Sequence, residues 1–506
     1  MIGNKIQQFK RQSQPLDRMA IVLMGILTLF IGFLILSGDH TSPRVREFSW
    51  NKRQISAADR AFVMTFSRPM NQDSVAQNLR IDPPLPGKLS WAGRRMVYTL
   101  LQPAPYGTPF SLQLQGATDK LYENQSGREI QPFTGYFRTR DRAFIYIGVE
   151  GQEEGRLMLV NLSQNPNPIP LTTPELGVTA FEPYPEGDRI LFSAVTKSES
   201  EIGIIGQFDP QLYTVTTGLS PNTWEQQDRL SQTAGKIELV LDNKKYRNLK
   251  FDLSPNGQVI VVQRVNKADS LDTSPWVIKS GQSPYSLKLQ GGDFLIGPDS
   301  QSLALAQGPD LNSIFPLKPE AKPLEVLTKY GQILGFSQEG SQAAMVKFNS
   351  DGTRSLFLVN NQGEERELYR TPAFGNILSA EFDPTGKILY CLLTELSDNT
   401  DEYQEQPYIA AIDIKSSEIT PLVILPKQQE INLSLSPDGL ALLFDQTVTQ
   451  ISSKNNIEIA PRSQSGDTIK TSRLWILPLD LPADGSPIRL QPEELPFLGY
   501  KPHWLP

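Results

Sequence analysis

Cysteine and histidine are scarce in this chain of 506 residues. The single cysteine, Cys391, excludes a disulfide within the chain and any metal site built on several cysteines. The two histidines, His40 and His503, leave little material for a zinc site or a histidine-activated nucleophile. Cys391 lies in the apolar run 388–393, so we expect it to be buried as a small hydrophobic residue. For His503 we expect a packed or rim position.

An excess of positive charge is also lacking. The formal net charge is -7, whereas a surface that neutralises phosphates needs an excess of lysine and arginine. The sequence therefore argues against a nucleic-acid partner. Two short basic clusters, Arg94 with Arg95 and the segment 244–247, are predicted to be solvated strand ends.

Sequence signatures of catalysis are missing as well. There is no glycine-rich phosphate loop, no Gly-x-Ser-x-Gly elbow and no His-Glu-x-x-His, and the acidic loop 398–402 lacks the glycine of a calcium loop. We therefore predict a protein that is not an enzyme, with no catalytic, cofactor-binding or metal-binding residues and no cofactor. Carboxylate pairs of the kind used in sugar chemistry stay open, because the sequence does not reveal how far apart its acids lie.

Long apolar runs are absent except for one, from Met19 to Leu36, which only Thr28 interrupts. Eighteen helical residues span about 27 Å, close to the hydrocarbon thickness of a bilayer. The run is longer than that of a signal peptide, and no small-x-small cleavage site follows it. We predict a cytoplasmic tail over 1–18 and an uncleaved transmembrane helix over 19–37, through which the chain contacts the membrane.

The orientation follows from charge near the apolar run. The tail 1–18 carries four basic residues and one acid, which favours a cytoplasmic N-terminus, although Arg44, Arg46, Lys52 and Arg53 weaken the contrast. A long folded domain is translocated largely regardless of such charges. We therefore expect a single-pass protein of the cytoplasmic (inner) membrane, with the bulk of the chain extracytoplasmic.

Residues 43–140 show the alternation of half-buried strands, separated by proline-rich turns. This spacing predicts a small β-sandwich. The clearest strand candidates are 61–66, 96–100 and 110–114.

The same segment resembles the bacterial Ig-like domain found in surface-layer and other envelope proteins. The resemblance implies a spacer or adhesion module and a core position for Phe66 and Trp91. It rests on the segments 66–70, 91–93, 106–107, 116–117 and 137–139.

After residue 140 a turn of the type Ser-Pro-Asp-Gly, followed by an apolar run, recurs along the chain. Proline presets φ, aspartate bonds to the backbone, glycine accepts a positive φ, and the apolar run fits a buried strand. Apart from one interval of about 70 residues, the copies are spaced by roughly 40 to 53 residues. This spacing is near the length of a four-stranded propeller blade. The six copies of this turn motif lie at 185–187, 254–257, 297–300, 337–340, 383–386 and 436–439.

These repeats resemble the bacterial TolB-type, WD-repeat-like β-propellers, and the resemblance covers 141–506. We expect residues 499–504 to pair with the first strands, near 144–149, and so to close a ring of seven blades, with six or eight as alternatives. The polar stretches 196–236 and 452–471 are predicted to be insertions. The predicted fold class is all-β after one transmembrane helix.

An anchor, a spacer and a propeller predict a non-catalytic scaffold of the cell envelope that binds another protein. Two alternatives stay open. One is recognition of a polysaccharide or peptidoglycan of the cell wall, suggested by Trp224 and Tyr403, and the other is a propeller lyase or glycosidase.

Overall fold

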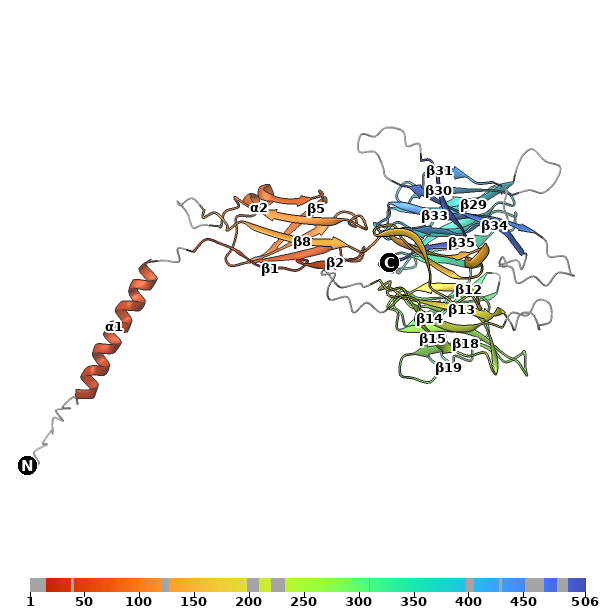
Figure 1. Cartoon of the computed structure of the whole chain (residues 1–506), viewed down its shortest axis with the longest axis horizontal. Helices are drawn as coiled ribbons and strands as arrows, with labels where there is room; N and C mark the ends of the chain where they lie inside the picture. Colours follow the sequence, from red (N-terminus) through yellow and green to blue (C-terminus); the bar gives the residue numbers. More distant parts are fainter. Residues whose placement is uncertain are drawn as a thin grey trace, which may run out of the picture.

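The computed structural model describes residues 15–37, 41–120, 127–197, 209–219, 233–308, 310–396, 405–426, 430–450, 468–479 and 490–506. Helix α1 (Pro15–Ser37) is followed by a β-sandwich and then by a ring of β-sheets (Figure 1). The large apolar side chains described between Met19 and Phe33 are exposed. Within the described residues, no helix has both the length and the apolarity required to cross a membrane. The transmembrane helix predicted over 19–37 is thus not shown by the structure.

The sandwich consists of two four-stranded sheets that share one apolar core. Alternation along β3 buries Phe62, Met64 and Phe66, and these meet Phe137 of the other sheet in the core. Phe66 stacks on the half-buried Trp91 at 5.7 Å between ring centroids, as a core role predicts. One sheet has the order β1 (Val45–Phe48), β3 (Ala61–Phe66), β6 (Arg95–Leu100), β5 (Gly87–Ala92), and the other β2 (Arg53–Ile55), β8 (Phe133–Thr139), β7 (Pro109–Leu114), β4 (Leu79–Asp82).

The sequence prediction missed the short helix α2 (Gln72–Asn78) in this sandwich. Its N-cap is Asn71, whose side-chain oxygen accepts a hydrogen bond from the backbone N–H of Ser74. The two-layer sandwich is confirmed, whereas its membership in the Ig-like family stays a prediction.

Five four-stranded antiparallel sheets then follow in chain order, each a simple meander. They contain β12 (Leu176–Pro183), β13 (Arg189–Thr196), β14 (Gln211–Thr216) and β15 (Ile237–Leu241); β16 (Tyr246–Leu253), β17 (Val259–Asn266), β18 (Thr273–Lys279) and β19 (Tyr285–Ser286); β20 (Phe294–Ile296), β21 (Ser302–Gly308), β22 (Leu311–Pro316) and β23 (Glu325–Leu327); β24 (Gln332–Phe336), β25 (Gln342–Phe348), β26 (Arg354–Asn360) and β27 (Glu365–Arg370); β28 (Asn376–Phe382), β29 (Ile388–Leu396), β30 (Glu405–Asp413) and β31 (Ile419–Ile424).

A seven-stranded sheet joins the two ends of this array. The last strand pairs with β9 in the register Tyr500 to Ile147 and Trp504 to Phe144, so the predicted pairing of 499–504 with the first strands is confirmed. The first strands β16 and β20, β24 and β28, and β28 and β32 contact one another across neighbouring sheets, as in a β-propeller. The order of this sheet is β11 (Asn165–Pro170), β10 (Leu157–Asn161), β9 (Ala143–Gly148), β35 (Glu493–Trp504), β34 (Thr468–Pro478), β33 (Ala441–Gln450), β32 (Leu433–Leu435), with a 3-10 turn at Gly151–Glu153.

All six copies of the turn motif connect the first strand of a sheet to its second. In each, the last residue of the motif donates its backbone N–H to the carbonyl three residues earlier and has a positive φ, from 57° to 75°. Five copies use glycine, and Ser300 takes this place in the third. The turn predicted from the residues of the motif, with a positive φ at its last position, is therefore confirmed.

One predicted insertion is wrong in part. The stretch 196–236 contains β14, the third strand of its sheet, whose polar threonines the sequence reading took for loop. The predicted insertion 452–471 lies outside the described residues up to 467, and from Thr468 it belongs to β34. Cys391 is fully buried in β29, as predicted.

Candidate functional site

The sandwich and the propeller meet at Asp438, the acid of the last turn motif. Its side chain is fully buried, and one of its oxygens accepts hydrogen bonds from the backbone N–H of Tyr106 at 2.9 Å and from Nη2 of Arg142 at 3.3 Å. The other oxygen accepts from the hydroxyl of Ser436 at 2.6 Å and from the N–H of Leu440 at 3.2 Å. Asp438 therefore shapes its own turn and holds the sandwich at the same time.

A second contact runs through Arg140, at the end of the sandwich. Its Nη1 donates to the carbonyls of Pro185 at 2.9 Å and Pro506 at 3.0 Å, and its Nη2 pairs with Oε2 of Glu186 at 2.8 Å. Pro185 and Glu186 belong to the first turn motif. Arg60 of the sandwich also donates to Gln338 at 3.1 Å and lies 3.9 Å from Glu339, both in the motif copy 337–340. Three copies of the turn motif thus contact the sandwich.

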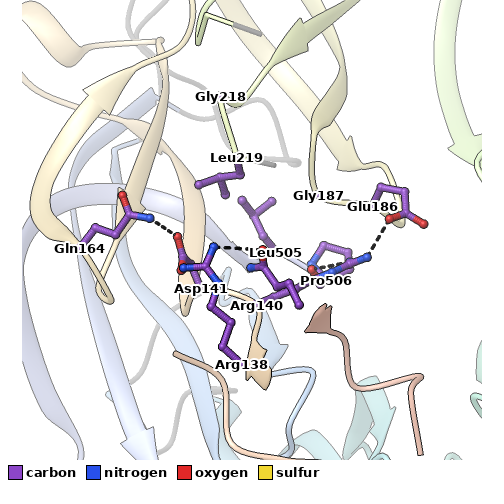
Figure 2. A pocket seen from close by; sticks show the side chains of 11 residues that line it. Arg138, Arg140, Asp141, Gln164, Glu186, Gly187, Gly218, Leu219, Leu505 and Pro506 are labelled. Carbon is purple, nitrogen blue, oxygen red and sulfur yellow. Dashed lines mark hydrogen bonds and ion pairs between the residues drawn. The ribbon is translucent and has the colours of Figure 1, made fainter. Parts of the chain in front are cut away.

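A pocket opens beside these contacts (Figure 2). It is small, with a volume of about 50 Å³, and is partly open to solvent. Figure 2 shows that Oδ2 of Asp141 is used by Gln164, and Oδ2 also accepts from Asn161. Since Arg140 is engaged by Glu186, the charges that line the pocket are largely paired with each other. The pocket is part of the junction between the domains.

A different set of acids lies on the first strands of the propeller sheets. Glu182, Asp252 and Glu381 each stand five residues before the last residue of a turn motif, on β12, β16 and β28. They are half-buried, although carboxylates seldom leave water without a partner. Because first strands surround the axis of a propeller, these acids converge on the centre of the ring.

Side chains at this position bond to the next sheet. Asp252 accepts from the N–H of Ile296 at 2.6 Å, and Glu381 accepts from the N–H of Leu435 at 2.8 Å. In the seven-stranded sheet a serine, Ser434 on β32, occupies the position and accepts from the N–H of Trp504 on β35 of the same sheet at 3.2 Å, where the ring closes. The position therefore serves as a link between neighbouring sheets.

Glu182 departs from this pattern. The N–H that would serve it, that of Leu253, donates to Oδ1 of Asp252 instead. Within the described part of the chain, the structure gives Glu182 neither a hydrogen bond nor an ion pair. The pKa of Glu182 is raised to about 8, mainly by burial and also by the nearby Asp252, while Lys250 opposes the rise. Burial likewise raises the pKa of Asp252.

A third group lies where the ring closes. Asp445 is fully buried and accepts from the N–H groups of Asn432 and Lys501, and burial raises its pKa to about 6. Lys501 donates from Nζ to the carbonyl of Thr179 on β12. Burial lowers the pKa of His503 to about 4, which fits the packed position predicted for it.

No site residues were predicted from the sequence, and the acids on the first strands were not among its candidates. Aligning the six turn motifs would have found Glu182, Asp252 and Glu381 in one column. Trp224, Tyr403 and the acidic loop 398–402, singled out from the sequence, lie outside the described residues. Among the residues that are described, no group of three or more metal-ligating side chains is positioned to hold a metal ion.

Comparison with known proteins gives distant matches only. No protein-family model matches the chain, and no curated protein sequence matches it. Among solved structures, it is similar to TolB from Acinetobacter baumannii, with 11% identity, a TM-score of 0.38 and coverage of 85% of this chain and 83% of that one. It is also similar to a putative 6-phosphogluconolactonase from Bacteroides fragilis, with 14% identity, a TM-score of 0.41 and coverage of 72% and 97%.

A third match is an oligogalacturonate lyase in complex with manganese, with 12% identity, a TM-score of 0.36 and coverage of 66% of this chain and 81% of that one. The printed names include two different enzyme activities, and the scores are low. These matches therefore assign neither a family nor an activity.

Proposed function

We propose that this protein is a non-catalytic scaffold of the bacterial cell envelope, whose propeller binds another protein outside the cytoplasm. In this proposal α1 anchors the chain in the cytoplasmic membrane, the sandwich is an Ig-like spacer and the ring has seven blades, with β35 shared between the last and the first. The exposed apolar side chains between Met19 and Phe33 support an anchor, because such side chains are stable in lipid.

The observation that carries the proposal is the junction at Asp438. A buried carboxylate that bonds both domains fixes the propeller against the sandwich, as expected if the sandwich holds a binding platform at a set position. A loose linker would not position the platform in this way.

The binding point that best fits this platform is the pair of neighbouring carboxylates Glu182 and Asp252. Because Glu182 is without a partner in the described structure, a lysine or arginine of the bound protein would satisfy it and favour its ionised form. A basic segment is accordingly the partner chemistry that we propose.

Affinity purification of the full chain from solubilised membranes tests the proposal. We expect a companion protein in constant proportion, and less of it with Glu182→Gln. Glu238→Gln is the matched control, since Glu238 is exposed on an outer strand and pairs with Lys236 at 2.7 Å. Recovery of the protein alone, in repeated purifications, would overturn the proposal.

A second candidate is a propeller glycosidase or lyase that acts on a wall polysaccharide. It is favoured by the same two acids, because neighbouring carboxylates of raised pKa suit acid–base chemistry on sugars. Incubation of the chain with cell-wall polysaccharide would release reducing or unsaturated ends, and Glu182→Gln would abolish the release. Binding of the polysaccharide without cleavage would instead indicate a recognition module. If the chain neither cleaves nor binds the polysaccharide, both alternatives are excluded.

A further inference from the structure

The sandwich and the propeller carry opposite net charge. Residues 43–140 contain fourteen lysines and arginines against seven acids, a net charge of +7. Residues 141–506 contain 30 basic and 46 acidic residues, a net charge of −16. The chain as a whole is acidic, so this basic domain is concealed in the overall charge of -7.

Much of the positive charge gathers at one end of the sandwich. Ser67 joins two of its members, because its hydroxyl accepts from the N–H of Arg44 at 3.0 Å and its carbonyl accepts from Nη1 of Arg94 at 3.3 Å. Arg68 follows directly and pairs with the buried Asp119 at 3.3 Å. We call this surface the basic end and define it by Arg44, Arg68, Arg94, Arg95, Lys120 and Arg128.

Asp119 binds the remaining members to the same surface. Its Oδ1 accepts from the N–H of Arg128 at 2.8 Å, and the N–H of its neighbour Lys120 donates to the carbonyl of Pro69 at 3.0 Å. Arg44, Arg94, Arg95 and Lys120 are exposed. The acids near this surface are fewer: Asp119 pairs with Arg68, Glu129 follows Arg128, Glu47 is in register with Thr65, the partner of Arg95, and Asp73 lies in the first turn of α2. The basic end thus keeps a clear positive excess.

The basic end is where the chain from α1 enters the sandwich. Thr41 accepts a hydrogen bond from Nη2 of Arg68, so the entering segment lies on this surface. The contacts with the propeller, at Tyr106 and Arg140, lie at the other end of the sandwich, and Figure 1 shows the sandwich between α1 and the propeller. The basic end therefore lies on the side of the sandwich that is nearer to α1.

We propose that the basic end binds anionic phospholipid headgroups of the membrane in which α1 is anchored. The inference rests on the proposed anchoring. Lysine and arginine side chains near an anionic surface are attracted to it, and the attraction fades within a Debye length. The anionic membrane surface also repels the acidic propeller. The positive sandwich and the negative propeller therefore orient the molecule with the sandwich toward the lipid and the propeller away from it.

Residues 41–506 provide a test that does not depend on α1. No residue of α1 belongs to an apolar cluster of the described structure, so this segment keeps all the described cores. Co-sedimentation with vesicles of phosphatidylcholine alone, or with about one third phosphatidylglycerol, measures lipid binding. We expect binding to the anionic vesicles only, and at least tenfold weaker binding when NaCl is raised from about 0.05 M to about 0.3 M.

The key variant replaces Arg44, Arg95 and Lys120 by glutamine, and we expect it to bind at least tenfold more weakly. The matched control replaces Lys52, Arg53 and Lys88, which are equally exposed and lie on or beside strands away from the basic end. Three results would each overturn the inference: equal binding to neutral vesicles, no effect of the key variant, or an equal effect of the control. Binding to a soluble anionic wall polymer but not to vesicles would overturn the lipid assignment as well.

This result is separable from that of the proposed function. If 41–506 ignores anionic vesicles while the full chain still purifies with a partner, the inference fails and the scaffold proposal stands. If 41–506 binds anionic vesicles and no partner is recovered with the full chain, the scaffold proposal fails and the lipid inference stands.

Discussion

The carboxylate of Asp438 accepts a 2.9 Å hydrogen bond from the backbone N–H of Tyr106, which lies 332 residues earlier in the chain. This bond makes the acid of a local turn part of an interface between two domains. Arg142, on the segment that connects the domains, donates to the same oxygen. A turn residue and a linker residue thereby set how the propeller is held.

Asp438→Asn tests this contact. We expect the free energy of unfolding to fall by about 2 kcal/mol, because donors that now meet the carboxylate would be left unsatisfied in a buried site. Urea unfolding followed by tryptophan fluorescence measures the loss. Asp351→Asn is the control, since Asp351 is exposed where it pairs with Arg370 and accepts from Thr353, and we expect a smaller loss there. Equal losses in both variants would contradict the role assigned to Asp438.

Glu182 predicts a particular dependence of stability on pH. Its pKa of about 8 in the folded chain exceeds the ordinary value of 4.5, so the folded state keeps a proton that the unfolded state releases between these pH values. The stability due to this group is therefore highest below about pH 4.5 and is lost as the pH rises to about 8.

Glu182→Gln removes this dependence. We expect the variant to gain about 2 kcal/mol over the natural chain on going from pH 5 to pH 8.5, a value discounted because Glu182 is only half-buried. Urea unfolding at both pH values gives the difference. Glu238→Gln should show no such gain, because the exposed Glu238 pairs with Lys236 and its pKa is lowered.

His503 should stay neutral far below its ordinary range. Burial lowers its pKa from 6.5 to about 4, so the stability that its neutral form contributes is present above pH 6.5 and is lost as the pH falls toward 4. In a His40→Gln variant, His503 is the only histidine, and NMR titration of its ring protons should give a midpoint near pH 4. A midpoint between 6 and 7 would mean that the ring is solvated.

A side chain in place of Gly439 would have two costs, backbone strain at a positive φ and crowding against Pro384, and a comparison with Gly363 separates them. Gly439 and Gly363 have nearly equal positive φ values, 75° and 78°, but a Cβ at Gly439 would lie 2.9 Å from Pro384, whereas a Cβ at Gly363 would meet no atom within 4 Å. We expect Gly363→Ala to cost about 1 kcal/mol from backbone strain and Gly439→Ala about 2 kcal/mol from strain and crowding. Thermal unfolding compares them, and equal costs would show that Pro384 moves aside freely.

The parts of the fold that depend on short sequences were predictable. The turn motif at 436–439 determines a turn and a following strand through its own residues, and all six copies form the turn that was expected. The pairing of β35 with β9 was also predicted, because an open edge needs a partner. Helix α2 and β14 were not predicted. The sequence of a short, polar helix and that of a strand with threonines both resemble the sequence of a loop.

The sequence by itself thus determined the apolar helix segment, the sandwich strands and the repeated turns, since proline, glycine and apolar alternation act over a few residues. Tertiary structure alone decided that Asp438 bonds Tyr106, that Glu182 faces Asp252 without a bond of its own, and that six basic residues meet at one end of the sandwich. The reason is physical. These relations join residues far apart in the chain, and their distances are set by how the sheets pack.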